Sequence, residues 1–117
     1  MHPSLRHHID TISPLVKSIT PAAAQQARDS GAIFIDVREP HEYQEQCIDG
    51  ALHIPRGLLE FAIWQNEQCH CDAEIILFCQ FGYRGLLATY ALQQLGFSHV
   101  SNLEGGLDAW QAELGQH

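Results

Sequence analysis

The sequence predicts an α/β protein with a mostly parallel sheet. Runs of aliphatic and β-branched residues alternate along the chain with segments of helical spacing. Two of the apolar runs, 32–37 and 74–78, are nearly continuous, which is typical of strands buried on both faces of a sheet. The chain has 117 residues, enough for one domain with one core. We therefore expect three layers: a five-stranded, mostly parallel sheet flanked by helices on both faces.

The boundaries of the elements follow from turn and capping residues. Residues 1–15 are a poorly patterned N-terminal lead-in, and a single domain is expected over 16–117. Thr20 and Pro21 have the residue types of an N-cap and a first helical position. The expected strands lie at 16–19, 32–37, 51–54, 74–78 and 97–101. The expected helices begin near 20, 39, 58, 84 and 105.

Composition excludes several classes of partner. The formal net charge is -8, and a nucleic-acid-binding protein would need a basic surface. No run approaches the roughly 20 apolar residues of a membrane-spanning helix, and the polar start does not resemble a secretory signal. We therefore expect a cytoplasmic protein without nucleic-acid or membrane partners. Its four cysteines are then expected to be reduced thiols.

The segment Cys79-Gln80-Phe81-Gly82-Tyr83-Arg84 lies between the most hydrophobic expected strand and a helix. Ligand sites of open α/β sheets lie at the carboxyl ends of strands, and helix N-termini offer free N–H groups to anions. Gly82 permits an unusual backbone conformation, and Arg84 adds a cation with several donors. These residues predict a nucleophilic sulfur in a small anion-binding loop. A lone cysteine after a strand, by contrast, is more often only a small buried side chain.

The spacing within this loop distinguishes two chemistries. Phosphatases of the Cys-x5-Arg type wrap a phosphoryl group, whereas Arg84 lies five positions after Cys79, which gives Cys-x4-Arg. The shorter loop favours a smaller group, such as one extra sulfur atom or the end of thiosulfate. A phosphatase or arsenate reductase remains the less favoured alternative.

Four segments in order resemble the rhodanese family of sulfurtransferases. One is the Cys79 loop itself, residues 79–84, which has the length of the family's sulfurtransferase loop. The others are FIDVREPHEY at 34–43, IDGALHIP at 48–55 and LEGGLDAW at 103–110. The resemblance extends from about residue 18 to residue 114. It implies a single rhodanese domain.

The resemblance also implies a mechanism. Cys79 would take sulfur from a donor such as thiosulfate, hold it as a persulfide and pass it to cyanide or a thiol. Backbone N–H groups of Gln80, Phe81, Gly82, Tyr83 and Arg84 would stabilise the persulfide, and no cofactor or metal is needed. Asp36 and Arg38 would lie beside the loop, as a structural pair or as part of the anion field. Arg56 would lie near its mouth, as a solvated charge or as a steering cation.

Two features leave the partners of the reaction open. Phe81 and Tyr83 are bulky where many members carry small or basic residues, so the donor and acceptor are not specified. A carrier or partner-binding domain that receives sulfur from a dedicated donor therefore remains an alternative, and the acceptor is a small thiol or a protein. Cys69-His70-Cys71 has too short a spacing for a usual zinc site and is expected to be a solvated loop.

Overall fold

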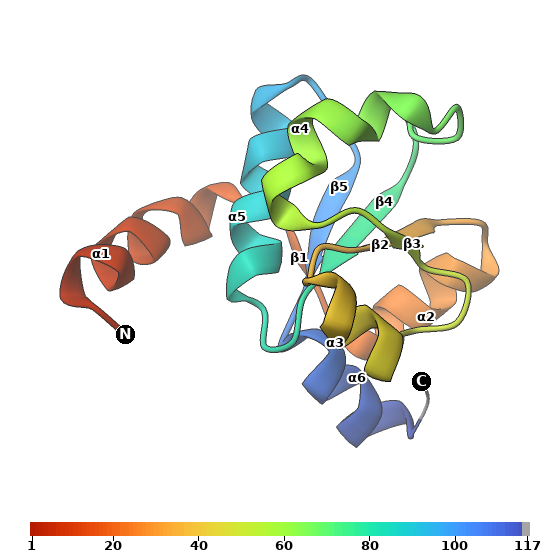
Figure 1. Ribbon diagram of the computed structural model, residues 1–117, viewed down its shortest axis with the longest axis horizontal. Coiled ribbons are helices and arrows are strands. Elements are labelled where there is room, and N and C mark those ends of the chain that lie inside the picture. Colours follow the sequence, from red (N-terminus) through yellow and green to blue (C-terminus); the bar gives the residue numbers. More distant parts are fainter. Residues whose placement is uncertain (116–117) are drawn as a thin grey trace.

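Five parallel strands form one sheet in the computed structural model of the protein, which describes residues 1–115 (Figure 1). The strand order is β1-β5-β4-β2-β3, and every neighbouring pair is parallel, so the predicted sheet is confirmed. The last two residues of the expected domain 16–117 lie outside the described residues. The strands are β1 (Ser18–Ile19), β2 (Ile33–Asp36), β3 (Leu52–His53), β4 (Ile75–Phe78) and β5 (Val100–Leu103).

Helices cover both faces of the sheet. Side chains of α4 and α5 pack on one face, and those of α2 and α6 pack on the other (Figure 1). The α-helices are α1 (Pro3–Ile12), α2 (Pro21–Asp29), α3 (Pro40–Glu45), α4 (Leu59–Ala62), α5 (Tyr83–Gln94) and α6 (Gly106–Leu114). Short 3-10 turns are η1 (Ser13–Leu15), η2 (Arg56–Leu58) and η3 (Ile63–Gln65), so the helix expected from 58 is broken into three short pieces. Within residues 1–115, no helix has the length and apolar character needed to cross a membrane.

The two faces of the central strands explain their continuous hydrophobicity. Successive side chains of a strand point to opposite faces. Phe34 of β2 packs edge-on against Trp110 of α6, with ring centroids 5.4 Å apart. Ile35 and Leu77 point the other way and join a buried cluster with Leu92 of α5. Both faces are therefore dry, which is why neither strand alternates polar and apolar residues.

The last strand begins later than expected. The sequence predicts a strand over 97–101, but β5 starts at Val100 because Phe97 belongs to the end of α5. Gly96 adopts a φ of 97°, and the N–H of Phe97 donates to the carbonyl of Leu92 at 3.0 Å. This is a Schellman helix end, in which the residue after glycine folds its apolar side chain back onto the helix. The β-forming composition of the segment concealed this local arrangement.

A helix occupies most of the segment that was expected to be poorly patterned. Within residues 1–15, α1 begins with Pro3 at its first position, which suits a helix start. Ile9 and Ile12 lie on one side of α1 and are buried against Leu86 of α5. Leu5, Ile9 and Ile12 stand at helical spacing, but a helix of ten residues is marginal in water by itself, so α1 depends on its contact with α5. Figure 1 shows α1 projecting from one side of the sheet domain.

Candidate functional site

Cys79 is the first residue after β4, and its sulfur lies inside a turn of the backbone. The side chain is 1% exposed. Its Sγ accepts hydrogen bonds from the N–H groups of Gly82, at 3.1 Å, and Gly85, at 3.2 Å. Both donors belong to the loop-to-helix junction, where the positive end of the helix dipole also lies. The arrangement stabilises negative charge at the sulfur, as a nucleophilic thiolate requires.

The N-terminus of α6 holds the base of this loop. The N–H of Leu107 donates to the carbonyl of Cys79 at 2.8 Å, and that of Asp108 donates to the carbonyl of Gln80 at 3.0 Å. Gly106 lies directly against these groups, and a Cβ there would overlap the carbonyl oxygen of Cys79. Its φ of 64° also favours glycine. Gly106 is therefore needed for the close approach of α6 to the Cys79 loop.

Asn102 of β5 holds the far side of the loop. Its Nδ2 donates to the carbonyl of Gly82 at 3.1 Å, and Gly82 itself has a φ of 111°. The Oδ1 atom of Asn102 is buried without a hydrogen-bond partner and lies against Gly85, where a Cβ would overlap it. Asn102 thus holds the backbone of Gly82 by a hydrogen bond and packs against Gly85, the other residue that donates to the sulfur.

Asp36 and Arg38 form a buried ion pair at the carboxyl end of β2. Both side chains are almost fully buried, and Nη2 of Arg38 lies 2.8 Å from Oδ2 of Asp36. The remaining terminal nitrogen, Nη1, donates to Oε1 of Gln80 at 2.9 Å. The backbone carbonyl of Arg38 is in turn bound by Nε2 of His53 at 2.8 Å. The predicted pairing of Asp36 with Arg38 is therefore confirmed, and it ties β2 to the Cys79 loop through Gln80.

The guanidinium of Arg84 is bound to an acid of α3. Its two terminal nitrogens donate to the two carboxylate oxygens of Glu42, at 2.8 and 2.9 Å. This hydrogen bonding lowers the pKa of Glu42 from 4.5 to about 2. The same bond raises the pKa of Arg84, and the nearby Cys79 acts in the same direction more weakly. The sequence suggested that Arg84 supplies a cation to the anion site, but the structure gives that cation an acidic partner.

The rim of the loop carries free backbone donors beside two exposed rings. In the described part of the chain, the N–H groups of Phe81, Tyr83 and Arg84 donate to no protein acceptor. The side chain of Phe81 is 62% exposed and that of Tyr83 is 44% exposed. An anion held at this rim would therefore meet backbone donors and aromatic surface together.

Arg56 lies at the same end of the sheet as Cys79. The N–H of Val37 donates to the carbonyl of Phe78 at 3.0 Å, and that of Arg56 donates to Val37 at 2.9 Å. The guanidinium of Arg56 is nevertheless paired with Glu60 at 2.8 Å, and both side chains are partly exposed. The backbone of Arg56 therefore lies next to Val37, which is itself bonded to the residue before Cys79. The guanidinium of Arg56 is directed to Glu60 of α4.

The other thiols lie away from Cys79 or in apolar surroundings. The carbonyl of Cys71 accepts the N–H of Ser98 at 3.0 Å, and Ser98 precedes β5. Cys71 therefore lies at the amino end of the sheet, whereas Cys79 lies at the carboxyl end. Four residues of strand span roughly 13 Å, and a disulfide needs Cα atoms within about 7 Å. Cys69 is buried, and burial raises the pKa of its thiol, so it is a poor nucleophile.

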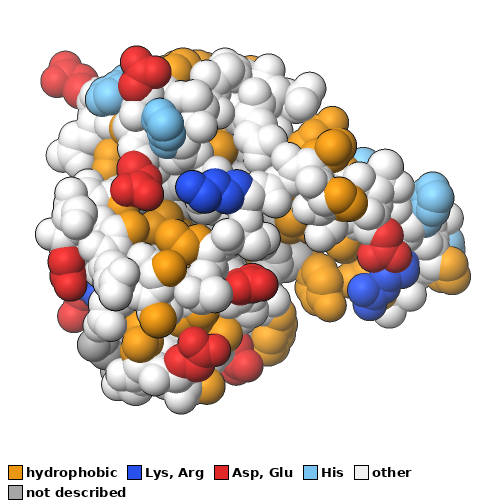
Figure 2. Space-filling view, turned by 180° about the vertical axis from the view of Figure 1, so that it is seen from behind, with side chains coloured by type: hydrophobic (Ala, Val, Ile, Leu, Met, Phe, Trp, Pro, Cys, Tyr) orange, Lys and Arg blue, Asp and Glu red, His pale blue; other side chains and the backbone are white. Residues whose placement is uncertain are grey.

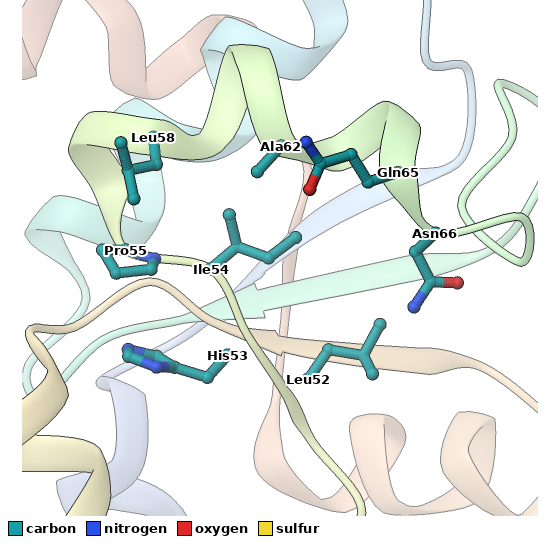
Figure 3. A pocket seen from close by; sticks show the side chains of 8 residues that line it. All are labelled: Leu52, His53, Ile54, Pro55, Leu58, Ala62, Gln65 and Asn66. Atoms are coloured by element: carbon teal, nitrogen blue, oxygen red, sulfur yellow. The ribbon is translucent and has the colours of Figure 1, made fainter.

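A cavity of about 350 Å³ lies under α4 and η3, beside the edge strand β3 (Figure 3). Figure 3 shows Leu58, Ala62 and Gln65 on the helical side and Leu52 and Ile54 on the strand side. Its lining combines apolar side chains with His53, Gln65 and Asn66 and contains no thiol. A second cavity, of about 310 Å³, adjoins the Cys79 loop and is lined by Phe81, Gly82 and Tyr83 on one side.

Sequence reasoning missed four of the residues that shape the site. Glu42 and Gly106 lie inside segments that the family resemblance had already singled out, but their roles depend on contacts across the fold. Asn102 lies in a strand, and no sequence pattern distinguishes a buried asparagine there from an exposed one. Arg6 of α1 lies with its guanidinium 5.8 Å from the ring centroid of Tyr83, in a segment where no helix was expected. For Asn102 and Arg6 the sequence offered no usable pattern.

Comparison with known proteins identifies relatives along most of the chain. The family model for the Rhodanese-like domain matches residues 20–113. A thiosulfate sulfurtransferase GlpE from Ectopseudomonas mendocina is 33% identical over 96 residues, which cover 82% of this chain and 85% of that protein. A probable adenylyltransferase/sulfurtransferase MoeZ from Mycobacterium tuberculosis is 34% identical over 83% of this chain, but the match spans 25% of that longer protein.

Solved structures agree with this assignment. The human single-domain sulfurtransferase TSTD1 superposes with a TM-score of 0.73 and 28% identity, covering 84% of this chain and 97% of that one. A protein of unknown function from Rhodopseudomonas palustris, described as a possible tyrosine phosphatase, has a TM-score of 0.83 and 25% identity. It covers 100% of this chain, including the region of α1, and 95% of its own. From the fold, the position of Cys79 and these matches, we conclude that the chain belongs to the rhodanese-like domain family.

Proposed function

We propose that this protein transfers sulfane sulfur through a persulfide on Cys79, with thiosulfate or a similar small anion as donor. The proposal depends on the hydrogen-bond donors around Sγ of Cys79. Two backbone N–H groups bind this sulfur, and further free N–H groups lie at the rim of the Cys79 loop. The relatives named thiosulfate sulfurtransferase support the same reaction class. A cytoplasmic location, where thiols stay reduced, is part of this proposal.

The first half-reaction loads the sulfur. The Cys79 thiolate attacks the outer sulfur of thiosulfate, a new S–S bond forms, and the original S–S bond breaks with its electron pair leaving on sulfite. The persulfide then carries one negative charge on its outer sulfur. In this scheme the N–H groups from Gln80 to Arg84 bind that sulfur and act as fixed donors where charge gathers. In this proposal Gly82, whose N–H already binds Sγ, is the central donor.

The second half-reaction passes the sulfur to cyanide or a thiol. The acceptor attacks the outer sulfur, and the S–S bond to Cys79 breaks so that the thiolate is regenerated. Arg38 takes part by holding Gln80, and Arg84 by adding positive charge near the loop while Glu42 fixes its direction. Both are positioning residues in this scheme. Arg56, like Arg84, is paired with an acid, but it is a weaker candidate for steering anions because its guanidinium is directed to Glu60 of α4.

Mass spectrometry of the intact protein tests the proposal directly. After incubation with thiosulfate, wild type should gain the mass of one sulfur atom at Cys79, and cyanide should remove it. Cys79→Ser should gain nothing and should lose thiosulfate-to-cyanide turnover. Cys71→Ser is the matched control and should load as wild type does. An unmodified Cys79, with turnover retained in Cys79→Ser, would exclude this mechanism.

A sulfur carrier would differ from a thiosulfate sulfurtransferase in its rate of thiosulfate turnover. A carrier would hold the persulfide but load slowly from thiosulfate and quickly from a dedicated donor. Comparing loading rates from thiosulfate and from a low-molecular-weight persulfide separates the two functions. Fast loading from thiosulfate supports the enzyme, and loading only from the persulfide supports the carrier.

A phosphatase is the second enzyme class, and the relative from R. palustris is described in those terms. The spacing Cys-x4-Arg opposes it, and so does the engagement of Arg84 by Glu42, because a phosphate-binding arginine needs its donors free. Hydrolysis of a phenyl phosphate that is lost in Cys79→Ser would favour this class. We expect no such hydrolysis above background.

A further inference from the structure

A cavity of about 310 Å³ separates α1 from the Cys79 loop, and its size is at the lower end of the range for small-ligand sites, ~300–1,000 Å³. The wall from α1 carries Arg6 and Asp10, and the opposite wall carries Phe81, Gly82 and Tyr83. Glu104, after β5, is a second acid in the lining. Figure 2 shows the projecting α1 segment with basic and acidic side chains close together, set apart from the body by a notch.

This wall is specific to the N-terminal segment of the chain. Helix α1 precedes residues 20–113, the region matched by the family model. Burial of Ile9 and Ile12 against Leu86 sets its position, and the cation–π contact of Arg6 with Tyr83 joins it to the rim of the loop. The helix therefore adds side chains to the approach to Cys79 that the matched region does not provide.

The cavity offers charges of both signs. Among residues 1–115, the salt bridges of the structure join Arg38, Arg56 and Arg84 to acids, and none involves Arg6, Asp10 or Glu104. Arg6 offers a fork of donors suited to a carboxylate, and Asp10 and Glu104 offer acceptors suited to an ammonium group. A simple dianion would be attracted by Arg6 but repelled by the two acids. A zwitterion matches the whole set.

Cys79 does not itself line the cavity, but one lining residue contacts its sulfur. Gly82 lines the cavity, and the N–H of the same residue lies 3.1 Å from Sγ of Cys79. A ligand whose charged groups lie in the cavity can therefore present a thiol at the loop, one residue away. Phe81 and Tyr83 supply apolar surface for the short carbon chain between the charged groups and the thiol.

We propose that this cavity binds the non-reacting part of a zwitterionic, amino-acid-type thiol that accepts sulfur from Cys79. The carboxylate binds Arg6, and the ammonium group binds Asp10 and Glu104. The acceptor thiolate attacks the outer sulfur of the persulfide, the bond between that sulfur and Sγ breaks, and its electron pair remains on Cys79 as thiolate. The acceptor leaves as a persulfide, so no further oxidant or reductant is required. This inference rests on the proposed persulfide function.

The test follows the discharge of a preloaded persulfide. Protein loaded by thiosulfate and freed from excess donor is mixed with L-cysteine, 3-mercaptopropionate, cysteamine or cyanide, and the loss of one sulfur mass is timed. Wild type should discharge faster to L-cysteine than to 3-mercaptopropionate or cysteamine, each compared at equal thiolate concentration. Cyanide, which has no carboxylate or ammonium group, provides the reference rate in every variant.

Single substitutions separate the two charge contacts. Relative to cyanide, Arg6→Gln should lower discharge by L-cysteine and 3-mercaptopropionate at least about tenfold, the loss expected for one charge-assisted hydrogen bond, and should spare cysteamine. Asp10→Asn should lower discharge by L-cysteine and cysteamine and spare 3-mercaptopropionate. Arg6→Lys should recover part of the loss. Arg28→Gln, on α2, is the matched control and should leave all ratios unchanged.

Two results would overturn the inference. One is an equal loss for all four acceptors in Arg6→Gln, which would mean that Arg6 only supports the loop. The other is equal discharge of wild type by the three thiols. Failure of the protein to load sulfur at all is a separate outcome, visible in the mass before any acceptor is added, and it would contradict the proposed function itself.

Discussion

Two arginines flank the Cys79 loop, and each is held by a carboxylate, but the two pairs lie in different surroundings. Arg38 and Asp36 are buried at the end of β2, whereas Arg84 is 40% exposed and Glu42 is 23% exposed. A buried charge that loses its partner has no water to replace it, whereas an exposed charge does. The difference indicates that the first pair is part of the scaffold and the second pair adjusts the field at the loop.

The largest expected effect is on the buried pair. Asp36→Asn leaves Arg38 charged and without its carboxylate, and removing one member of a buried pair typically costs about 3 to 5 kcal/mol. The free energy of unfolding from urea titration measures this loss. Glu42→Gln is the matched control at the exposed pair. If the two substitutions cost the same, burial is not what distinguishes the pairs.

An intermediate effect on stability is expected at Gln80, where the buried Asp36–Arg38 pair contacts the Cys79 loop. Gln80→Ala removes the acceptor of Arg38 Nη1 without unpairing Asp36, so stability should fall by about 1 to 2 kcal/mol. The rate of persulfide loading at Cys79 should fall by more than the loss of folded protein accounts for, because the loop loses its hydrogen bond to Arg38 at the end of β2. Loading rate and unfolding midpoint are to be measured on the same samples. A normal loading rate would remove Gln80 from the positioning of the loop.

The exposed pair should contribute little to stability at neutral pH, about 1 kcal/mol or less. Its contribution depends on pH because the pKa of Glu42 is lowered from 4.5 to about 2, mainly by the hydrogen bond from Arg84. A lowered carboxyl pKa adds stability that is complete above the unfolded value and is lost as pH falls from about 4.5 toward 2. The difference in unfolding free energy between wild type and Glu42→Gln should shrink over that range. A difference that stays constant with pH would contradict the pairing.

The smallest effect concerns the field of Arg84 on the sulfur. Arg84→Ala removes a cation near Cys79 and should slow alkylation of Cys79 at neutral pH by a few-fold, about threefold. Added inert salt should reduce the difference between wild type and variant, since the charge is partly exposed. Alkylation followed by mass spectrometry, with Arg56→Ala as the control cation, checks both points. Equal rates at low salt would show that Arg84 acts only through Glu42.

Much of the fold was predictable because its signals are local. The continuous apolar runs of β2 and β4 predicted a sheet buried on both faces, and Thr20 with Pro21 predicted the start of α2, where the Thr20 side chain accepts the N–H of Ala23. The prediction of secondary structure was wrong where a residue with strand-forming character makes a different contact in the fold. Phe97 looked like part of a strand, but its backbone closes the end of α5.

The candidate site was predictable in its centre and not at its edges. Cys79, Gly82 and Arg84 stand within six consecutive residues, so their chemistry was visible as one motif. Glu42 and Asn102 reach the same loop from distant parts of the chain. Their contacts arise from strand order and helix packing, and neither leaves a periodic or compositional signal.

The sequence by itself determined the α/β class, the reactive cysteine and the short loop that follows it, because residue type and spacing dictate these features locally. Only the tertiary structure decided which partner each charge has, that Gly106 brings α6 against the loop, and that α1 forms a wall beside it. These features depend on the energies of burial and of long-range contacts, which exist only once the strands have been arranged in their order.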